Sequence, residues 1–259
     1  SLIKDSYTDV NIIGNDRVGG IAGEITEYIK QNRKLANEKD FFEFGLENCS
    51  SIGTMKVGYF GGGLVGGSHG TFEITNSHSS MNITSSGIGG CTVGGLVGVN
   101  YFGTIENSYY SNDLIIMDKY SILGGLVGQN IGNAIINNCY HTGVLVGGDV
   151  GGIAAINSGN SVISNCYNTG ELTGSTYVGG ITGKNSYRSS ILDSYNSGDI
   201  MGNNGALFGG VKVGGIAGIN DDISTIHNCY NLGDITVPDD AEGITGGLVG
   251  VNYYLSEII

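Results

Sequence analysis

The sequence predicts an all-β fold, a parallel β-helix (β-solenoid) of about eight coils with three short strands in each coil. The observations behind this prediction are a glycine phrase that returns eight times and apolar residues that recur in fixed columns. The phrase is Gly-Gly-Leu-Val-Gly or a close relative, and its copies occupy residues 19–23, 62–66, 94–98, 124–128, 151–155, 179–183, 214–218 and 246–250. From the second copy onward, successive copies start 27 to 35 residues apart. Periods in this range are typical of stacked arrays in which each unit buries its apolar face against its neighbours.

The unit at residues 150–174 shows how one coil is built. It holds three short apolar segments separated by glycine, asparagine and serine, and each segment is too short for a helix. Such segments, rich in β-branched residues and bounded by turn residues, are typical of strands. Each strand then pairs with its counterpart one coil above and one below. Because parallel crossover connections are right-handed in nearly all proteins, we expect a right-handed helix.

Three apolar columns are expected to form the core. Each fully buried Leu or Ile contributes about 1.5–3 kcal/mol, so three stacked columns suffice for a thin, continuous core. The column after the glycine pair is Ile21, Leu64, Leu96, Leu126, Ile153, Ile181, Ile216 and Leu248. The column that heads the phrase Ile-x-Asn-Cys/Ser-Tyr is Ile3, Leu46, Ile74, Ile105, Ile136, Ile163, Ile191 and Ile226. The column after the Asn-x-Gly turn is Leu145, Leu172, Ile200 and Ile235.

Glycine and asparagine mark the corners. The glycine pair either turns a corner with positive φ or lets neighbouring backbone approach closely, which a Cβ would block. Asparagine recurs in two registers, which we interpret as structural ladders, because stacked amides hydrogen-bond along the axis and Asn tolerates the left-handed region. One register is Asn100, Asn130, Asn157, Asn185, Asn220 and Asn252. The other is Asn48, Asn76, Asn107, Asn138, Asn165 and Asn228, with Asp5 and Asp193 as substitutes.

The repeat runs through residues 1–259 as a single domain, with coils beginning near residues 3, 46, 74, 105, 136, 163, 191 and 226. Residues 24–44 depart from the rhythm, and we expect an insertion there, a projecting loop or a short helix. The chain opens inside one repeat and closes just after another, so we expect it to be a piece of a longer protein.

The composition limits the kinds of partner that the protein is expected to bind. The formal net charge is −13 and the pI is about 4.4, and an acidic surface repels the phosphate backbone of nucleic acids. The chain has no apolar run of the length that spans a bilayer, so we expect no membrane span in this fragment. Four of the five cysteines share a column with serine, which predicts small, buried, free thiols: Cys49, Cys139, Cys166 and Cys229.

Two acidic groups are candidate calcium sites, since calcium binds carboxylate and carbonyl oxygens. They are Asp221-Asp222 and the group Asp239, Asp240 and Glu242. Neither follows the pattern of an EF-hand loop. We therefore expect solvated acidic loops and no cofactor, with calcium binding as the alternative.

An aromatic column offers a candidate ligand platform. It contains Tyr109, Tyr140, Tyr167, Tyr195 and Tyr230, with Tyr7 in the first copy and Ser50 and His78 in the next two. In one interpretation sugar rings stack on these tyrosines. In the other, each ring covers the next in a structural stack and the hydroxyl reaches solvent.

No motif in the sequence predicts catalysis, and we expect no enzyme. The basic residues within the array are sparse and are not expected to lie in register with acids. The four histidines lie far apart and form no His-Glu-x-x-His zinc motif. A polysaccharide lyase or hydrolase is the alternative, because parallel β-helices often carry such enzymes and that chemistry needs positioned acids.

The recurring phrase resembles the GLUG motif of bacterial surface proteins and of the immunoglobulin A metalloproteases of streptococci. The matching text includes Gly95-Leu96-Val97-Gly98 with Asn100, followed by Thr104-Ile105-Glu106-Asn107-Ser108-Tyr109. The resemblance implies a β-solenoid in an extracellular setting, either secreted or on the bacterial cell surface. It supplies no catalytic residues. We expect an adhesin-like binding or spacer module whose partners are other domains of the parent protein and a host glycan or host protein.

Overall fold

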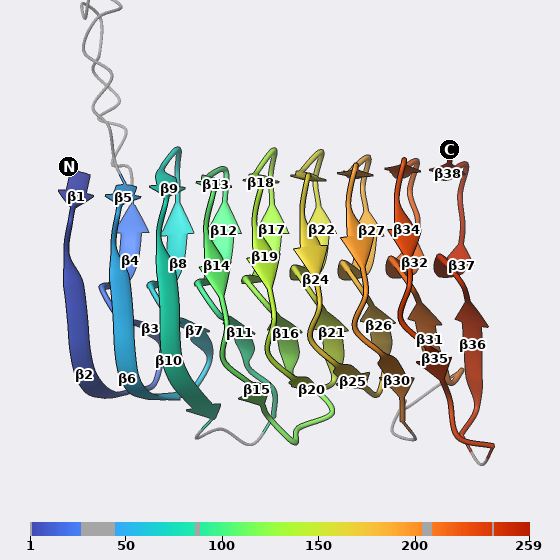
Figure 1. Ribbon diagram of the computed structural model, residues 1–259, viewed down its shortest axis with the longest axis horizontal. Helices are drawn as coiled ribbons and strands as arrows, with labels where there is room; N and C mark the ends of the chain where they lie inside the picture. The colour runs from blue at the N-terminus through green and yellow to red at the C-terminus, as the bar shows by residue number, and fades with distance from the viewer. Residues whose placement is uncertain (1, 27–44, 86–88, 204–208, 240) are drawn as a thin grey trace, which may run out of the picture.

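The chain folds into one stack of parallel strands. The computed structural model describes residues 2–26, 45–85, 89–203, 209–239 and 241–259. Within these ranges there are strands and no helix. The strands form five parallel sheets, A to E, and Figure 1 shows the coils standing side by side along one axis. The predicted parallel β-helix is confirmed.

Sheets A, B and E form the first part of each coil. Sheet A contains β1 (Leu2–Lys4), β5 (Gly45–Glu47), β9 (Glu73–Thr75), β13 (Thr104–Glu106), β18 (Ile135–Asn137), β23 (Val162–Ser164), β28 (Ser190–Leu192), β33 (Thr225–His227) and β38 (Glu257–Ile258). Sheet B contains β2 (Tyr7–Gly14), β6 (Ser50–Val57), β10 (His78–Ser85), β14 (Tyr109–Tyr110), β19 (Tyr140–His141), β24 (Tyr167–Asn168), β29 (Tyr195–Asn196) and β34 (Tyr230–Asn231). Sheet E contains β15 (Leu114–Ile115), β20 (Leu145–Gly147), β25 (Leu172–Gly174), β30 (Ile200–Gly202) and β35 (Ile235–Thr236).

Sheets C and D return the chain to the next coil. Sheet C contains β3 (Arg17–Gly19), β7 (Phe60–Gly62), β11 (Thr92–Gly94), β16 (Ile122–Gly124), β21 (Asp149–Gly151), β26 (Tyr177–Gly179), β31 (Val211–Gly214) and β36 (Gly243–Gly246). Sheet D contains β4 (Ala22–Thr26), β8 (Val65–His69), β12 (Val97–Tyr101), β17 (Val127–Ile131), β22 (Ala154–Ser158), β27 (Thr182–Ser186), β32 (Ala217–Asn220) and β37 (Val249–Asn252). Sheets B, C and D each hold eight strands, so seven full turns separate the first copy from the eighth.

The number of strands per coil differs from the prediction. Each coil contains four or five strands rather than three, because two segments expected to be continuous are bent. Asn165 has φ 53° and separates β23 from β24. The bend at Gly152 and Ile153 separates β21 from β22. In the first three coils the long strands β2, β6 and β10 cover the stretch that later coils divide between sheets B and E.

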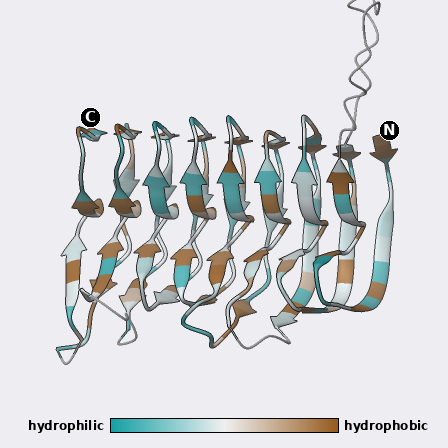
Figure 2. Ribbon diagram, turned by 180° about the vertical axis from the view of Figure 1, so that it is seen from behind, coloured by the Kyte–Doolittle hydropathy of each residue, from teal (hydrophilic) through white to brown (hydrophobic). Residues whose placement is uncertain are grey.

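The apolar columns lie in register. In sheet A, Ile105 pairs with Ile136 and Ile136 with Ile163, and in sheet E, Leu145 pairs with Leu172. All of these side chains are fully buried or nearly so. Figure 2 shows both hydrophobic and hydrophilic bands along the coils. In short strands such as β13 the central residue is buried and its neighbours are more exposed, as expected where successive side chains point inward and outward. The buried core therefore runs through the interior coils and thins at the two ends, where the predicted core residue Ile3 is exposed and Leu248 is only partly buried.

The phrase glycines allow close approach of backbone. A Cβ on Gly94 would overlap the carbonyl oxygens of Val97 and Leu126. The positive-φ glycines among the described residues all lie outside the phrase, as at Gly159. Of the two predicted roles, close approach is confirmed and positive φ is wrong.

The cysteines of the column are free, as expected, but the expected burial fails at Cys229, which is half-buried. All five cysteines are free, and Cys49, Cys139 and Cys166 are buried. The sequence did not predict their hydrogen bonds. The Sγ of Cys166 donates to the carbonyl oxygen of Ser164 at 3.0 Å, and the Oγ of Ser108 donates to that of Glu106 at 2.7 Å. The column therefore needs a small side chain that also donates.

The expected insertion at residues 24–44 falls mostly outside the described part of the chain. Residues 24–26 are the end of β4. The remainder, residues 27–44, lies outside the described residues. The loop between β35 and β36 is described except for Asp240.

Candidate functional site

The tyrosine column forms a continuous ring stack on sheet B. Neighbouring ring centroids from His78 to Tyr230 are 4.8 to 5.2 Å apart, and the ring planes lie within 8° of each other. The five rings from His78 to Tyr195 are half-buried, and Tyr230 at the end is exposed. Each interior ring therefore has both faces covered by its neighbours.

This geometry limits what the tyrosine stack can bind. A sugar that stacks flat on an aromatic ring needs an open ring face. The interior tyrosines, such as Tyr140 and Tyr167, present ring edges and hydroxyls, which suit hydrogen bonds. Burial raises the pKa of Tyr140 and Tyr195, so these hydroxyls are protonated and can donate at neutral pH.

A second exposed feature lies at the corner between sheets D and A, which we call the D–A corner. From the fourth coil onward two consecutive residues there have positive φ, between 47° and 75°. The pairs are Gly132-Asn133, Gly159-Asn160, Tyr187-Arg188, Asp222-Ile223 and Tyr254-Leu255. Glycine and asparagine suit this conformation, whereas each bulky residue costs about 1–2 kcal/mol there. Apart from Asp222, the last three coils therefore place unsuited residues at a corner that Gly-Asn forms equally well.

Hydrogen bonds between coils hold the D–A corner in shape. The amide of Asn157 donates to Oδ1 of Asn185 at 2.9 Å and to the carbonyl of Ser161 at 3.3 Å, across the corner. The backbone N–H of Arg188 donates to the carbonyl of Asp222 at 2.9 Å, in the next coil. This register of asparagines is buried from Asn100 to Asn220 and hydrogen-bonded from Asn100 to Asn252, as the sequence predicts. The stack thus imposes the corner on whatever residues occupy it.

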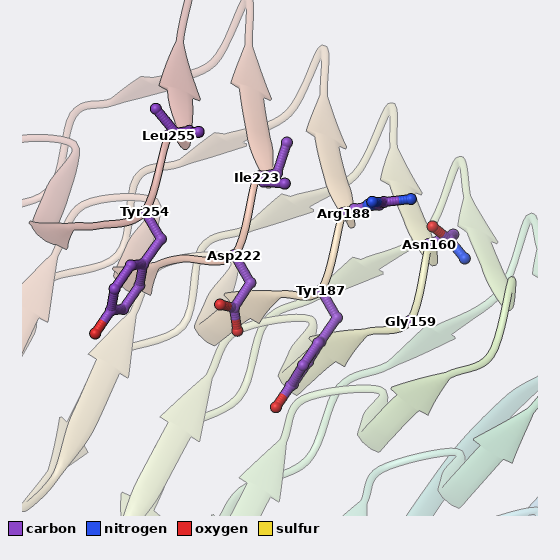
Figure 3. A pocket seen from close by; sticks show the side chains of 8 residues that line it. All are labelled: Gly159, Asn160, Tyr187, Arg188, Asp222, Ile223, Tyr254 and Leu255. Carbon is purple, nitrogen blue, oxygen red and sulfur yellow. The ribbon is translucent and has the colours of Figure 1, made fainter.

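The side chains of the D–A corner line an open groove, which we call the corner groove, of about 530 Å³. Its lining residues are Gly159, Asn160, Tyr187, Arg188, Asp222, Ile223, Tyr254 and Leu255. Large side chains are well exposed here: Tyr187 at 62%, Ile223 at 51%, Tyr254 at 72% and Leu255 at 85%. In Figure 3 the side chains of Tyr187, Asp222 and Tyr254 project to one side of the backbone. Those of Ile223 and Leu255 project to the other.

An acid–lysine group lies beside the D–A corner, because Lys184 belongs to β27 of sheet D and Asp221 directly follows β32. Lys184 Nζ is 3.3 Å from Oδ2 of Asp221. Burial raises the pKa of Asp149 to about 6, and Lys184 is close enough to oppose that shift. Burial also raises the pKa of Asp221. The register partner of Lys184 in the next coil is Ile219, so the ion pair with Asp221 lies two residues out of register and does not contradict the expectation that lysines and acids are not in register.

The residues of the two predicted acidic groups differ in burial and in their contacts. Asp221 is buried, at 8% exposed, and bonded to Lys184, so it is not a solvated loop residue. Asp222 lies in the corner groove. Of the other group, Asp239 and Glu242 are described, and Asp240 lies outside the described residues. Within the described part of the chain no three His, Cys, Asp or Glu side chains gather as metal ligands.

A third polar ladder, which the sequence did not predict, runs inside sheet B. It follows the tyrosine column by one residue and contains Ser51, Ser79, Tyr110, His141, Asn168, Asn196 and Asn231. His141 Nδ1 lies 2.8 Å from Oδ1 of Asn168, and the Asn168 amide donates to Oδ1 of Asn196 at 2.8 Å. Burial lowers the pKa of His141 to about 4, so its ring is neutral at pH 7. The changing residue types conceal this ladder in the sequence.

The stack and its outward-facing sites define a β-solenoid repeat protein. The family model of the GLUG motif matches residues 61–84, 89–115 and 209–236. The chain thus contains a GLUG-repeat region, as the resemblance predicts. Comparison of the chain with curated proteins and with solved structures gave no match. The described residues contain no helix that could cross a membrane.

Proposed function

We propose that the chain is a non-catalytic, extracellular module of a bacterial surface protein, secreted or attached to the cell, that binds a partner and spaces other domains as an adhesin does. The observation that carries this proposal is that inward-facing and outward-facing side chains have different roles. Inward-facing residues such as Asn157 and Ile163 join one coil to the next. Outward-facing residues such as Tyr187 and Tyr254 are exposed at the D–A corner, which two other coils form with Gly-Asn.

The stack is suited to act as a spacer. Seven steps of about 4.8 Å separate the first and eighth copies, a distance of roughly 34 Å. From the fourth coil onward, sheets A to E recur at each step, so additional coils of this kind lengthen the rod without a new design. Small-angle X-ray scattering of the purified chain should give a rigid rod of constant cross-section. A flexible chain of separate globules would contradict the spacer role.

Two exposed features support the binding role. The tyrosine stack from Tyr109 to Tyr230 offers ring edges and hydroxyls, and the D–A corner offers open aromatic faces. The partners proposed for the module are other domains of the parent protein and a host glycan or host protein. Antibody labelling and protease treatment of intact bacteria that make the full-length protein test the location. Labelling confined to permeabilised cells would refute the proposed extracellular setting.

The proposed module works without a resident cofactor. A metal chelator should leave the thermal unfolding midpoint unchanged, and added calcium should not raise it. A calcium-dependent increase that is lost in Asp239→Asn would instead favour calcium binding at the acidic loop.

A polysaccharide lyase or hydrolase is the second candidate, and the environment of Asp149 is the observation that favours it. A carboxyl group with a pKa near 6 beside a lysine resembles an acid–base pair. Incubation with a panel of polysaccharides, followed by assays for reducing ends and for unsaturated uronates, tests it. The non-catalytic proposal expects no turnover. Turnover that disappears in Asp149→Asn would establish the enzyme instead.

A further inference from the structure

We propose that the corner groove docks an extended, basic segment of a partner protein, with a lysine or arginine side chain held between Tyr187 and Tyr254 against Asp222. The inference rests on the proposed binding function and names the class of its partner. The first observation is which residues occupy the D–A corner in each coil. The fourth and fifth coils form the D–A corner with Gly-Asn pairs, so the last three coils could do the same. They instead carry Tyr187-Arg188, Asp222-Ile223 and Tyr254-Leu255, and all of these residues except Asp222 disfavour the left-handed conformation.

The row Tyr187, Asp222 and Tyr254 has the chemistry of a cation site. These residues occupy the same position in three successive coils, so the carboxylate lies between two aromatic side chains, one coil away on either side. All three side chains project to the same side of the backbone in Figure 3. Aromatic faces and a carboxylate together attract an ammonium or guanidinium group.

The opposite row favours a protein over a sugar. Ile223 and Leu255 are exposed, carry no polar atoms and lie in neighbouring coils. A polyhydroxylated ligand gains little from such aliphatic side chains, whereas apolar side chains of a peptide pack against them. Exposed Tyr, Arg and aliphatic residues gathered around a groove are also typical of protein–protein interfaces.

Charge complementarity points to a basic segment. The chain carries a formal net charge of −13, which draws cationic partners over distances of about a Debye length. Lys184 is bonded to Asp221 and leaves Asp222 as the neighbouring acid that faces the groove. The guanidinium of Arg188 extends toward Asn160, at the other end of the groove (Figure 3).

The dimensions suit a short extended peptide. The groove crosses four successive coils, from Asn160 to Leu255. Three steps of about 4.8 Å make it roughly 14 Å long, the length of about four residues of extended chain. A peptide of that length can place a basic side chain beside Asp222 and an apolar one beside Leu255.

The experiment uses an array of synthetic hexapeptides of mixed sequence and a matched array of neutral oligosaccharides, both probed with the labelled chain. The wild type is compared with a corner variant in which all three pairs become Gly-Asn: Y187G, R188N, D222G, I223N, Y254G and L255N. The second variant, Asp222→Asn, keeps the shape of the side chain. Glu171→Gln is the charge-matched control, because Glu171 is exposed in the loop before β25, in the part of the coil opposite the D–A corner.

We expect peptides with a basic and an apolar residue to be selected and binding to weaken as salt rises. Asp222→Asn should weaken the selected peptides about tenfold, and the corner variant should lose them while staying folded. Glu171→Gln should bind as the wild type does. Three results would overturn the inference: no selected peptides, selection that survives in the corner variant, or selection of neutral oligosaccharides alone. The last would still leave the module a binding protein, whereas enzymatic turnover would refute the proposed function itself.

Discussion

Two corners of the same coil hold left-handed residues, and they differ in how their residues suit that backbone. At the corner between sheets A and B, the left-handed position is always Asn or Asp, with φ from 48° to 53°. At the D–A corner, two coils carry Gly-Asn and three carry pairs with bulky residues such as Tyr187 and Ile223. The first corner follows backbone preference at every copy, as expected of a structural element. The second departs from it with side chains that are well exposed, as expected of a surface kept for binding.

The largest expected effect lies in the ladder that holds the D–A corner. Asn157 bonds Asn130, Asn185 and Ser161 from a fully buried position. Asn157→Leu should lower the free energy of unfolding by about 3 kcal/mol or more, because it leaves buried polar groups unpaired. Urea unfolding followed by circular dichroism measures this. A loss under about 1 kcal/mol would mean that the ladder does not impose the corner.

The pH dependence tests the buried ladder of sheet B. Burial lowers the pKa of His141 from 6.5 to about 4 in the folded state. Between these pH values the unfolded chain binds a proton at His141 and the folded protein does not. His141 therefore removes stability as pH falls from 6.5 to 4, about 3 kcal/mol in total. His141→Asn, which copies Asn168 in the next coil, should remove that loss. Unfolding free energies at pH 7 and pH 4 measure it.

Asp149 supplies the opposing control for that measurement. Its folded-state pKa is raised from 3.8 to about 6, so the folded protein binds the proton first and gains stability as pH falls from 6 to 3.8. Asp149→Asn should abolish this gain and make the acid loss due to His141 more evident. If both variants show the pH profile of the wild type, the burial of these two groups does not govern stability.

The tyrosine stack should behave as a structural ladder. Tyr167→Ala removes two ring contacts, at 5.0 and 5.2 Å, and should cost about 1–3 kcal/mol. Tyr167→Phe keeps the rings stacked and should cost much less. Thermal unfolding of the two variants compares them. Equal losses would show that the hydroxyl rather than the ring stack matters.

The smallest effect is expected at the corner between sheets A and B. Asn165→Gly should change the unfolding free energy by less than about 1 kcal/mol, because glycine adopts positive φ readily. Asn165→Ala should cost about 1 kcal/mol. The pair of variants, measured by urea unfolding, shows whether backbone preference selects the residue here. A larger loss in the glycine variant would assign the role to the side-chain amide.

Much of the stack could be predicted from the sequence because one residue type repeats at each position. The columns through Ile136 and Leu145, the left-handed Asn165 and the small donor at Cys166 all follow from local patterns. Their partners are the same residue type one coil away. The predicted number of strands per coil is wrong because the apolar pattern does not show the bend at Gly152. The residues on both sides of that bend are apolar.

The candidate site was largely beyond prediction. The left-handed backbone of Tyr187 and Ile223 comes from hydrogen bonds to neighbouring coils, and it opposes the preference of those residues. The pairing of Lys184 with Asp221 crosses a coil of different length, so no fixed spacing reveals it. One usable signal existed: large apolar residues stand where the fourth and fifth coils have Gly-Asn.

The most direct test of the contrast between the two corners is the stability of the corner variant. With all three pairs replaced by Gly-Asn, relief of unfavourable φ should raise the free energy of unfolding by about 1 kcal/mol per pair. Urea unfolding of the variant and the wild type, at the same protein concentration and pH, measures the difference. A more stable variant would show that the bulky side chains are displayed at a cost to folding. A less stable one would show that they hold the coil together, and would contradict the account.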